Sequence, residues 1–236
     1  MRRLTVYKYG IIGAMDVEVE LLLSALDEKA NMKRAAMEFH EGTLGGRDAV
    51  IVKSGIAKVN AALCVQILAD EYHVTHIINT GVAGSLDAAI NIGDIVLSTD
   101  ACYHDVDATI FGYKPGEVPQ MGRLEFPADA DLRVALKQAI EKAAPDIGVF
   151  EGRIVSGDQF IADPDRKNRI KETWNALCTE MEGAAIAQAA YLNDIPFCIV
   201  RAISDKADGS DVVDYPVFEK KAAADCAALI KAFLQG

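Results

Sequence analysis

Cysteine is sparse and scattered in this chain, and its spacing excludes several kinds of site. The five cysteines form no Cys-x-x-Cys pair, their number is odd, and no histidine stands at zinc-ligand spacing from them. A zinc site or a disulfide scaffold needs paired cysteines at characteristic spacings. We therefore expect five buried, reduced thiols and no bound metal.

Basic residues are also few. The chain has 24 Lys and Arg against 35 Asp and Glu, a net charge of −11, and it has no Lys/Arg-rich block. Such a surface would repel a nucleic-acid backbone. There is no long apolar run for a membrane span, and the segment after Met1-Arg2-Arg3 is broken by Lys8 and has no small-residue cleavage site. We expect a cytoplasmic protein that binds neither nucleic acid nor membrane.

The chain does show a regular alternation of strand and helix patterns. Its 236 residues are 51% hydrophobic, and no Pro/Ser-rich linker divides them. We predict a single α/β domain, residues 1–236, with a mixed central sheet, because a hairpin around the turn at 45–47 adds antiparallel strands. Strands are expected at 5–14, 39–44, 48–53, 76–80, 94–99, 148–156, 176–181 and 196–203. Helices are expected at about 16–26, 57–71, 131–143, 163–173, 182–192 and 215–234.

One connecting segment is unusually long. The residues from Tyr103 to Phe126 are rich in turns and aromatic side chains, including Phe111 and Tyr113. Loops of more than about a dozen residues in a compact domain are usually functional or disordered, and the aromatic content argues against disorder. We expect a binding or interface loop.

Acidic side chains follow two of the predicted strands. Glu180 and Glu182 stand at the end of one, where α/β proteins build ligand sites, and a carboxylate there can accept hydrogen bonds from both hydroxyls of a ribose diol. Alternatively, Glu182 only complements the dipole of the helix that follows. Asp205 ends the next strand, where a dry floor would raise its pKa and keep it protonated as a general acid; alternatively it is a cap.

The first strand leads into a loop that is unsuited to phosphate. Gly13 to Glu18 carries two acids and no base, whereas a phosphate loop combines glycine amides with Lys or Arg. Lys53 and Lys58 could still bind an anion elsewhere. Glu18 itself fits either a general base or a solvated acid in a first helical turn.

Two further loops could contact a flat ligand. The loop at 81–84 has glycines that allow close approach but lacks a complete dinucleotide fingerprint. Phe160 follows another strand, where it could stack on a purine or belong to the core.

Five motifs, in their order along the chain, resemble those of the 5′-methylthioadenosine/S-adenosylhomocysteine nucleosidases. The resemblance extends from about Gly10 to the last helix. It implies the purine nucleoside phosphorylase-like fold, a three-layer α/β/α sandwich, and a homodimer that hydrolyses the bond between adenine and a 5′-thio-substituted ribose without a cofactor. The motifs are Ile11-Ile12-Gly13-Ala14-Met15 with Glu18, Asn79-Thr80-Gly81-Val82-Ala83-Gly84, Ser156-Gly157-Asp158-Gln159-Phe160-Ile161, Glu180-Met181-Glu182 and Arg201-Ala202-Ile203-Ser204-Asp205.

The resemblance implies a role for each matching residue. Glu18 would activate water, a protonated Asp205 would donate to adenine N7, and an ionised Glu182 would hold the ribose diol. Phe160 would stack on adenine while the backbone of Ile161 reads its edge. The other implied site residues are Ala14, Met15, Val82, Ala83, Gly84, Glu180, Met181, Arg201, Ser204 and Tyr215, with Phe111, Tyr113 and Pro119 contributed by the partner subunit.

Several alternatives stay open at this point. Some relatives carry Ser where this chain has Val82, so a hydroxyl contact is lost there. A purine nucleoside phosphorylase shares the fold but uses phosphate, an aminofutalosine nucleosidase shares the catalytic groups, and a non-catalytic nucleoside sensor would share the pocket. Retention of both Glu18 and Asp205 argues against a sensor.

Overall fold

The computed structural model describes residues 7–207 and 215–236, with the side chains of the second range described from Val217 onward. The strands are β1 (Lys8–Gly13), β2 (Asp27–Arg34), β3 (Met37–Leu44), β4 (Arg47–Lys53), β5 (His76–Ser85), β6 (Ile95–Tyr103), β7 (Phe126–Pro127), β8 (Val149–Ser156), β9 (Ala176–Glu180) and β10 (Phe197–Asp205). The helices are α1 (Asp16–Ala25), α2 (Lys58–Asp70), α3 (Ala130–Ala143), α4 (Pro164–Trp174), α5 (Gly183–Leu192) and α6 (Tyr215–Gln235), with a 3₁₀ turn at Thr109–Phe111.

The strands form one mixed sheet in the order β10-β6-β8-β9-β5-β1-β4-β3-β2, with β7 beside β6. The predicted α/β class with a mixed sheet is confirmed. Because β10 also pairs with β5, the five strands β10, β6, β8, β9 and β5 close on themselves, and the rest of the sheet extends outward from β5. No local pattern along the chain indicates this closure.

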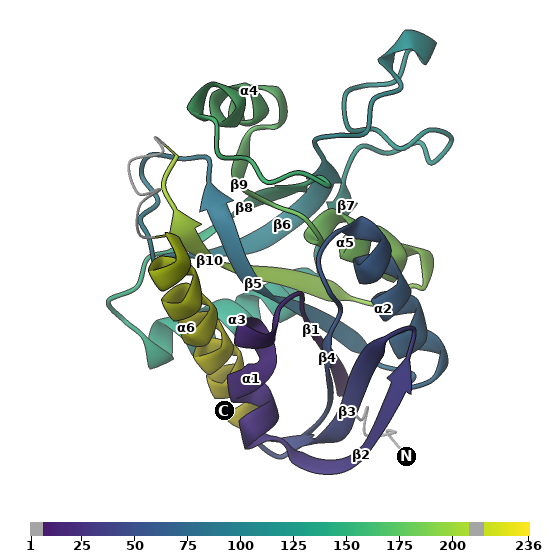
Figure 1. Ribbon diagram of the computed structural model, residues 1–236, viewed down its shortest axis with the longest axis vertical. Helices are drawn as coiled ribbons and strands as arrows, with labels where there is room; N and C mark the ends of the chain where they lie inside the picture. Colours follow the sequence, from purple (N-terminus) through teal and green to yellow (C-terminus); the bar gives the residue numbers. More distant parts are fainter. Residues whose placement is uncertain (1–6, 208–214) are drawn as a thin grey trace.

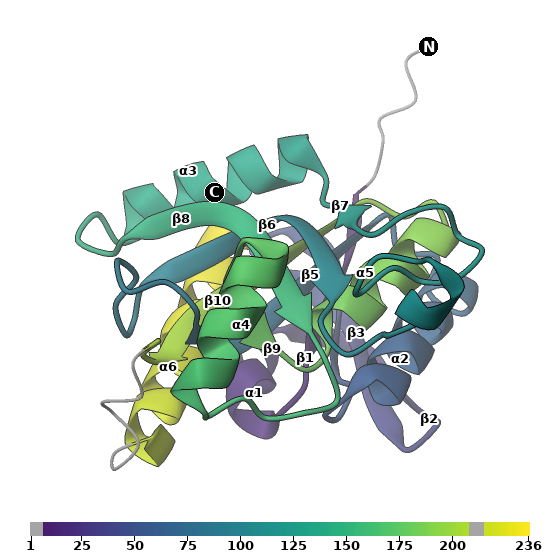
Figure 2. The same ribbon diagram turned by 90° about the horizontal axis from the view of Figure 1, so that it is seen from above.

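Helices cover the sheet on both faces (Figures 1 and 2). On one face α2 packs against α5, and on the other α6 packs against α1 and α3. Each face has its own apolar core. The first core includes Phe39, Leu68 and Ile186, and the second includes Leu22, Leu136 and Ile230.

The register of the strands brings several carboxyl ends together. Asp205 of β10 lies opposite Gly84 of β5, Gly84 lies opposite Thr179 of β9, and Glu180 of β9 lies opposite Ser156 of β8. Loops leaving these strands therefore meet at one edge of the sheet, which is where ligands bind in α/β proteins.

Most element types agree with the prediction, but strands β2 and β7 were not predicted, and β5 is longer than predicted. The segment Gly81 to Gly84 was expected to be a loop, but β5 continues through it to Ser85. A Cβ atom at Gly81 would overlap the guanidinium of Arg201 and the carboxylate of Glu18. Glycine at position 81 thus allows the side chains of Arg201 and Glu18 to lie directly against the backbone of the strand.

The five cysteines are buried and free, as predicted. Among the described residues, no helix is long and apolar enough to cross a membrane.

Candidate active site

A cavity of about 150 Å³ opens where the carboxyl ends of the strands converge. It brings together most of the residues that the sequence motifs implied. Those that line it are Ala14, Met15, Glu18, Val82, Ala83, Gly84, Phe160, Ile161, Glu180, Met181, Glu182, Ser204 and Asp205. Ile56, Gln159, Thr179 and Glu219 also line it and were not predicted.

Glu18 lies at the base of this cavity, in the first turn of α1, and is only 2% exposed. Its Oε2 accepts hydrogen bonds from the backbone N–H groups of Ala14 at 2.6 Å and Met15 at 3.0 Å, and its Oε1 accepts one from Val82 at 3.1 Å. Burial raises the pKa of Glu18, opposed by the nearby Arg201 charge and by these three amides. The alternative of a solvated surface acid is excluded.

Arg201 is fully buried beneath the cavity, on β10. Its guanidinium pairs closely with the carboxylate of Glu180, lies 3.6 Å from Glu182 Oε2, and donates to Asn79 Oδ1 at 2.6 Å. Arg201 therefore supports the acidic residues from below and does not line the cavity itself.

Glu180 and Glu182 have different surroundings. The carboxylate of Glu180 also accepts from the Ser156 hydroxyl and from the backbone N–H groups of Glu182 and Gly183. The two oxygens of Glu180 therefore already accept hydrogen bonds from Arg201 and from the turn that leads into α5. In Glu182, Oε1 accepts from the backbone N–H of Ala57 at 2.8 Å, which leaves Oε2 with the longer Arg201 contact. Glu182 is thus the better placed of the two to receive ribose hydroxyls.

The expectation that Glu182 is ionised does not agree with its surroundings. Burial, followed by the charge of Glu180, raises the pKa of Glu182 to about 8, against lowering effects of Arg201 and the Ala57 amide. The protonated carboxyl is therefore favoured at neutral pH. A ribose hydroxyl can donate to the carbonyl oxygen of that form and accept from its O–H.

Asp205 ends β10 and contacts a lysine that the sequence reasoning missed. Lys167 of α4 places its Nζ 2.5 Å from Asp205 Oδ2 and 2.6 Å from the carbonyl oxygen of Lys206. The Ser204 hydroxyl lies 3.2 Å from Asp205 Oδ1 and 3.3 Å from the carbonyl oxygen of Ala83, and it can donate its one proton to either. The predicted dry floor is wrong in part, because Asp205 keeps a side-chain exposure of 17% and faces an ammonium group.

The loop that carries Phe160 is held by charged residues from other loops. Lys58 contacts Asp105 at 2.8 Å, and Asp105 accepts from the backbone N–H of Asp158 at 2.9 Å. Asp158 in turn accepts from the backbone N–H of Lys58 at 2.9 Å. Phe160 projects from this loop with 62% of its surface exposed, so the core alternative is excluded.

Besides Arg201, three of the implied residues do not line the cavity. Phe111, Tyr113 and Pro119 lie on the long loop between β6 and β7, away from it. Tyr215 begins α6, but its side chain lies outside the described residues.

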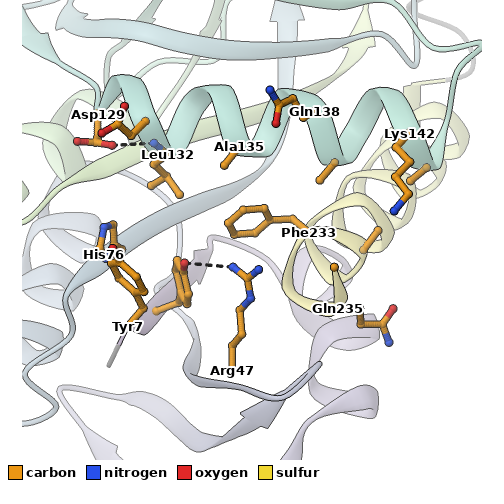
Figure 3. A pocket seen from close by; sticks show the side chains of 16 residues that line it. Tyr7, Arg47, His76, Asp129, Leu132, Ala135, Gln138, Lys142, Phe233 and Gln235 are labelled. Carbon is orange, nitrogen blue, oxygen red and sulfur yellow. Dashed lines mark hydrogen bonds between the residues drawn. The ribbon is translucent and has the colours of Figure 1, made fainter. Parts of the chain in front are cut away.

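A larger cavity of about 760 Å³ lies at the opposite end of the strands, between α3 and α6 (Figure 3). There Arg47 donates to the Tyr9 hydroxyl at 3.3 Å and lies over the ring of Phe233. The carboxylate of Asp129 accepts from the backbone N–H of Leu132 and caps α3. Among its described lining residues there is no converging set of buried acids, so the smaller cavity is the candidate active site despite its size.

Known proteins resemble this chain over nearly its whole length. The model of the phosphorylase superfamily matches residues 8–235. The chain is 42% identical over 228 residues to a 5′-methylthioadenosine/S-adenosylhomocysteine nucleosidase of Halalkalibacterium halodurans, covering 96% of this chain and 97% of that protein. It is 41% identical over 226 residues to the nucleosidase of the same description from Staphylococcus aureus, covering 95% and 98%.

Solved structures show the same similarity. The crystal structure of the 5′-methylthioadenosine/S-adenosylhomocysteine nucleosidase of Neisseria meningitidis, in complex with methylthio-immucillin-A, matches with a TM-score of 0.91 at 36% identity, covering 97% of this chain and 98% of that one. The futalosine hydrolase of Helicobacter pylori matches with a TM-score of 0.89 at 30% identity, covering 97% of each chain.

Proposed function

This chain belongs to the phosphorylase superfamily and, within it, to the 5′-methylthioadenosine/S-adenosylhomocysteine nucleosidases, and on that premise we propose that it hydrolyses the N-glycosidic bond of these two nucleosides with Glu18 and Asp205 as catalytic groups. The family predicted from the five motifs is confirmed, and with it the purine nucleoside phosphorylase-like fold. The products would be adenine and the 5′-thioribose.

The hydrogen bonding of Glu18 carries the proposal of hydrolysis over phosphorolysis. A phosphate group at this edge of the sheet would need backbone N–H donors. The amides of Ala14, Met15 and Val82 already donate to the Glu18 carboxylate, which would also repel an anion. A carboxylate whose pKa is raised by burial is instead suited to accept a proton from water near neutral pH.

The two lysines that could have bound an anion support the same conclusion. Lys53 pairs with Asp16 at 2.7 Å, and Lys58 pairs with Asp105 at 2.8 Å. Both positive charges are neutralised by acids of the chain.

The mechanism assigns one task to each acidic group. Asp205 donates a proton to adenine N7 as the bond from C1′ to N9 breaks, so the electron pair leaves on a neutral base. Glu182 holds the ribose hydroxyls as positive charge develops at C1′. Glu18 takes a proton from the water that attacks C1′. Proton donation to the leaving group contributes about 10² to 10⁴ in rate in comparable enzymes.

Val82 differs from the serine of some relatives without removing this arrangement. Its contribution to the site is the backbone N–H that donates to Glu18, which any residue other than proline supplies.

A homodimer is part of the proposal. Large apolar side chains are exposed on α2, on α5 and on the loop before β7, which lie on the same side of the molecule in Figure 1. They include Val59, Leu63, Leu192, Ile110 and Phe111, with exposed fractions of 47% to 88%. Large apolar side chains that are exposed together on one side mark an interaction site. The loop residues Phe111, Tyr113 and Pro119 would then reach the partner's cavity.

The dimer can be tested by complementation. Phe111→Ser should lower activity by changing the pocket of the partner subunit. Asp205→Asn should inactivate the pocket of the subunit that carries it. Mixed dimers of the two variants should regain part of the activity, which neither variant shows alone. Absence of any recovery in verified mixed dimers would contradict a shared pocket.

A cytoplasmic location is also proposed, and five buried free thiols fit a reducing compartment.

The function is tested by incubating the protein with methylthioadenosine, S-adenosylhomocysteine, aminofutalosine and inosine, and measuring free base. Adenine from the first two with inosine unchanged supports the proposal. Faster release from aminofutalosine would instead favour the function named for the Helicobacter pylori neighbour.

A further inference from the structure

An ammonium group lies almost fully buried beside the proposed catalytic acid. Lys167 is 1% exposed, although it belongs to α4, a helix that is otherwise largely exposed. Its Nζ contacts Asp205 Oδ2 at 2.5 Å and the carbonyl oxygen of Lys206 at 2.6 Å. Burial of an unpaired ammonium is costly, so these two acceptors fix its position.

The pair differs from an ordinary ion pair on the same helix. Lys171, one turn further along α4, contacts Asp87 at 2.9 Å, but both side chains are partly exposed, at 38% and 29%. Such an exposed ion pair contributes little to the stability of the fold. It also lies outside the cavity. Asp205, in contrast, lines the cavity, and its partner is shielded from water.

We propose that Lys167 is a positioning residue for the reaction, which holds Asp205 Oδ2 and stabilises the carboxylate that remains when Asp205 gives its proton to the leaving base. The inference rests on the proposed function, because it assumes that Asp205 is the acid. Oδ1 has the weaker 3.2 Å contact from Ser204 and is the oxygen that can turn to the base.

The proton and charge balance shows why a cation is useful there. The proposed step starts from a protonated Asp205 beside the Lys167 ammonium. The proton passes from Asp205 to adenine N7, the C1′–N9 electron pair moves onto the base, and water supplies hydroxide to C1′ while Glu18 takes its proton. Asp205 is then a carboxylate facing Lys167, which is the ion pair seen in the structure. Solvent afterwards removes the proton from Glu18 and returns one to Asp205.

A substrate with a different leaving group separates this role from a merely structural one. The 4-nitrophenyl glycoside of 5-methylthioribose loses nitrophenolate, which departs without protonation, but it still needs Glu18 and Glu182. A residue that acts through the acid should therefore matter for methylthioadenosine and not for the nitrophenyl substrate.

The test compares Lys167→Met with Lys167→Arg, with Asp205→Asn as the reference and Lys171→Met as the matched control. We expect Lys167→Met to lower kcat for methylthioadenosine about 10- to 100-fold, with little change in KM and less than about threefold loss on the nitrophenyl substrate. Lys167→Arg should retain most of the activity because it keeps the charge. Lys171→Met should match the unchanged protein on both substrates.

Two outcomes would overturn the inference. Equal loss on both substrates would show that Lys167 only maintains the fold, and unchanged turnover of methylthioadenosine would show that it has no role. If Lys167→Met fails to fold, Lys167→Gln is measured in the same way. Failure of the proposed function looks different, because adenine release would then persist in Asp205→Asn itself.

Discussion

Replacing Glu182 by glutamine should make the folded protein more stable at alkaline pH. The carboxyl is buried beside Glu180, and its pKa is raised from 4.5 to about 8. Between these two pH values the folded protein keeps a proton that the unfolded chain has lost. Stability must therefore fall as the pH rises through this window. Glutamine has the same shape and carries no charge at any pH, so it removes this dependence.

The size of the effect follows from the two values. Each pH unit in which one extra proton is bound corresponds to about 1.4 kcal/mol, which gives on the order of 5 kcal/mol over the whole window and about 2 kcal/mol between pH 6 and pH 8. Arg201, the Ala57 amide and the charges of Glu180 and Glu18 face this carboxyl and are included in its raised pKa. Burial also raises the pKa of Glu18, but Glu18 is present in both proteins and so does not contribute to the difference between them.

The assay is urea unfolding at pH 6, 7, 8 and 9 at one protein concentration. Glu20→Gln is the matched control, since it removes an exposed carboxylate from α1. The free energy of unfolding should fall less with pH in Glu182→Gln than in the unchanged protein, and the variant should be the more stable of the two at pH 9. Parallel pH dependences in these two proteins would refute the reasoning.

Four further predictions concern the site and the core. Asp205→Asn and Glu18→Gln should each lower kcat for methylthioadenosine by about 10² to 10⁴ while the circular dichroism stays unchanged, and near-normal turnover would contradict the assigned role. Phe160→Ala should raise KM about tenfold in steady-state kinetics, because stacking on a base is worth about 1–3 kcal/mol, and an unchanged KM would argue against stacking. Arg201→Met should lower the free energy of unfolding by about 3–5 kcal/mol, because it leaves the buried Glu180 and Glu182 without their cation, and a loss below 1 kcal/mol in urea titrations would be inconsistent with that. No cysteine should react with a thiol reagent at pH 8 in the folded protein, since burial raises the pKa of thiols such as Cys198 to about 12, and all five should react in guanidinium.

Periodicity and turn residues predicted most elements because they are local signals. The α2 and α3 helices and the hairpin of β3 and β4 follow from apolar spacing and from the Gly45-Gly46 turn. The closure of the sheet through β10 and β5 depends on pairing between residues more than 100 positions apart. No local pattern reports such a pairing. Strand β5 is longer than predicted because Gly81 and Gly84, a residue type common in loops, continue the strand here.

The candidate site was predictable where its residues belong to motifs at strand ends. Lys167 belongs to no such motif and was not predicted. Its neighbour Asp205 stands at the end of a predicted strand, which marks it as a candidate site residue. Lys167, in contrast, lies in a helix of mixed charge, where no strand end marks it. A signal was present, because Lys167 and Ile170 are three apart and both face inward, as does part of Trp174. Helical spacing could have identified the lysine as an inner residue, but not its partner. The raised pKa of Glu182 was missed for a similar reason, since it depends on burial that only the fold creates.

The identity of the sugar product tests the central claim most directly. Methylthioadenosine is incubated with the protein in phosphate-free buffer and in phosphate buffer, and the products are separated and identified by mass. Hydrolysis predicts adenine and free 5-methylthioribose in equal amounts and at the same rate in both buffers. Adenine release that requires phosphate, with 5-methylthioribose 1-phosphate as the product, would contradict it.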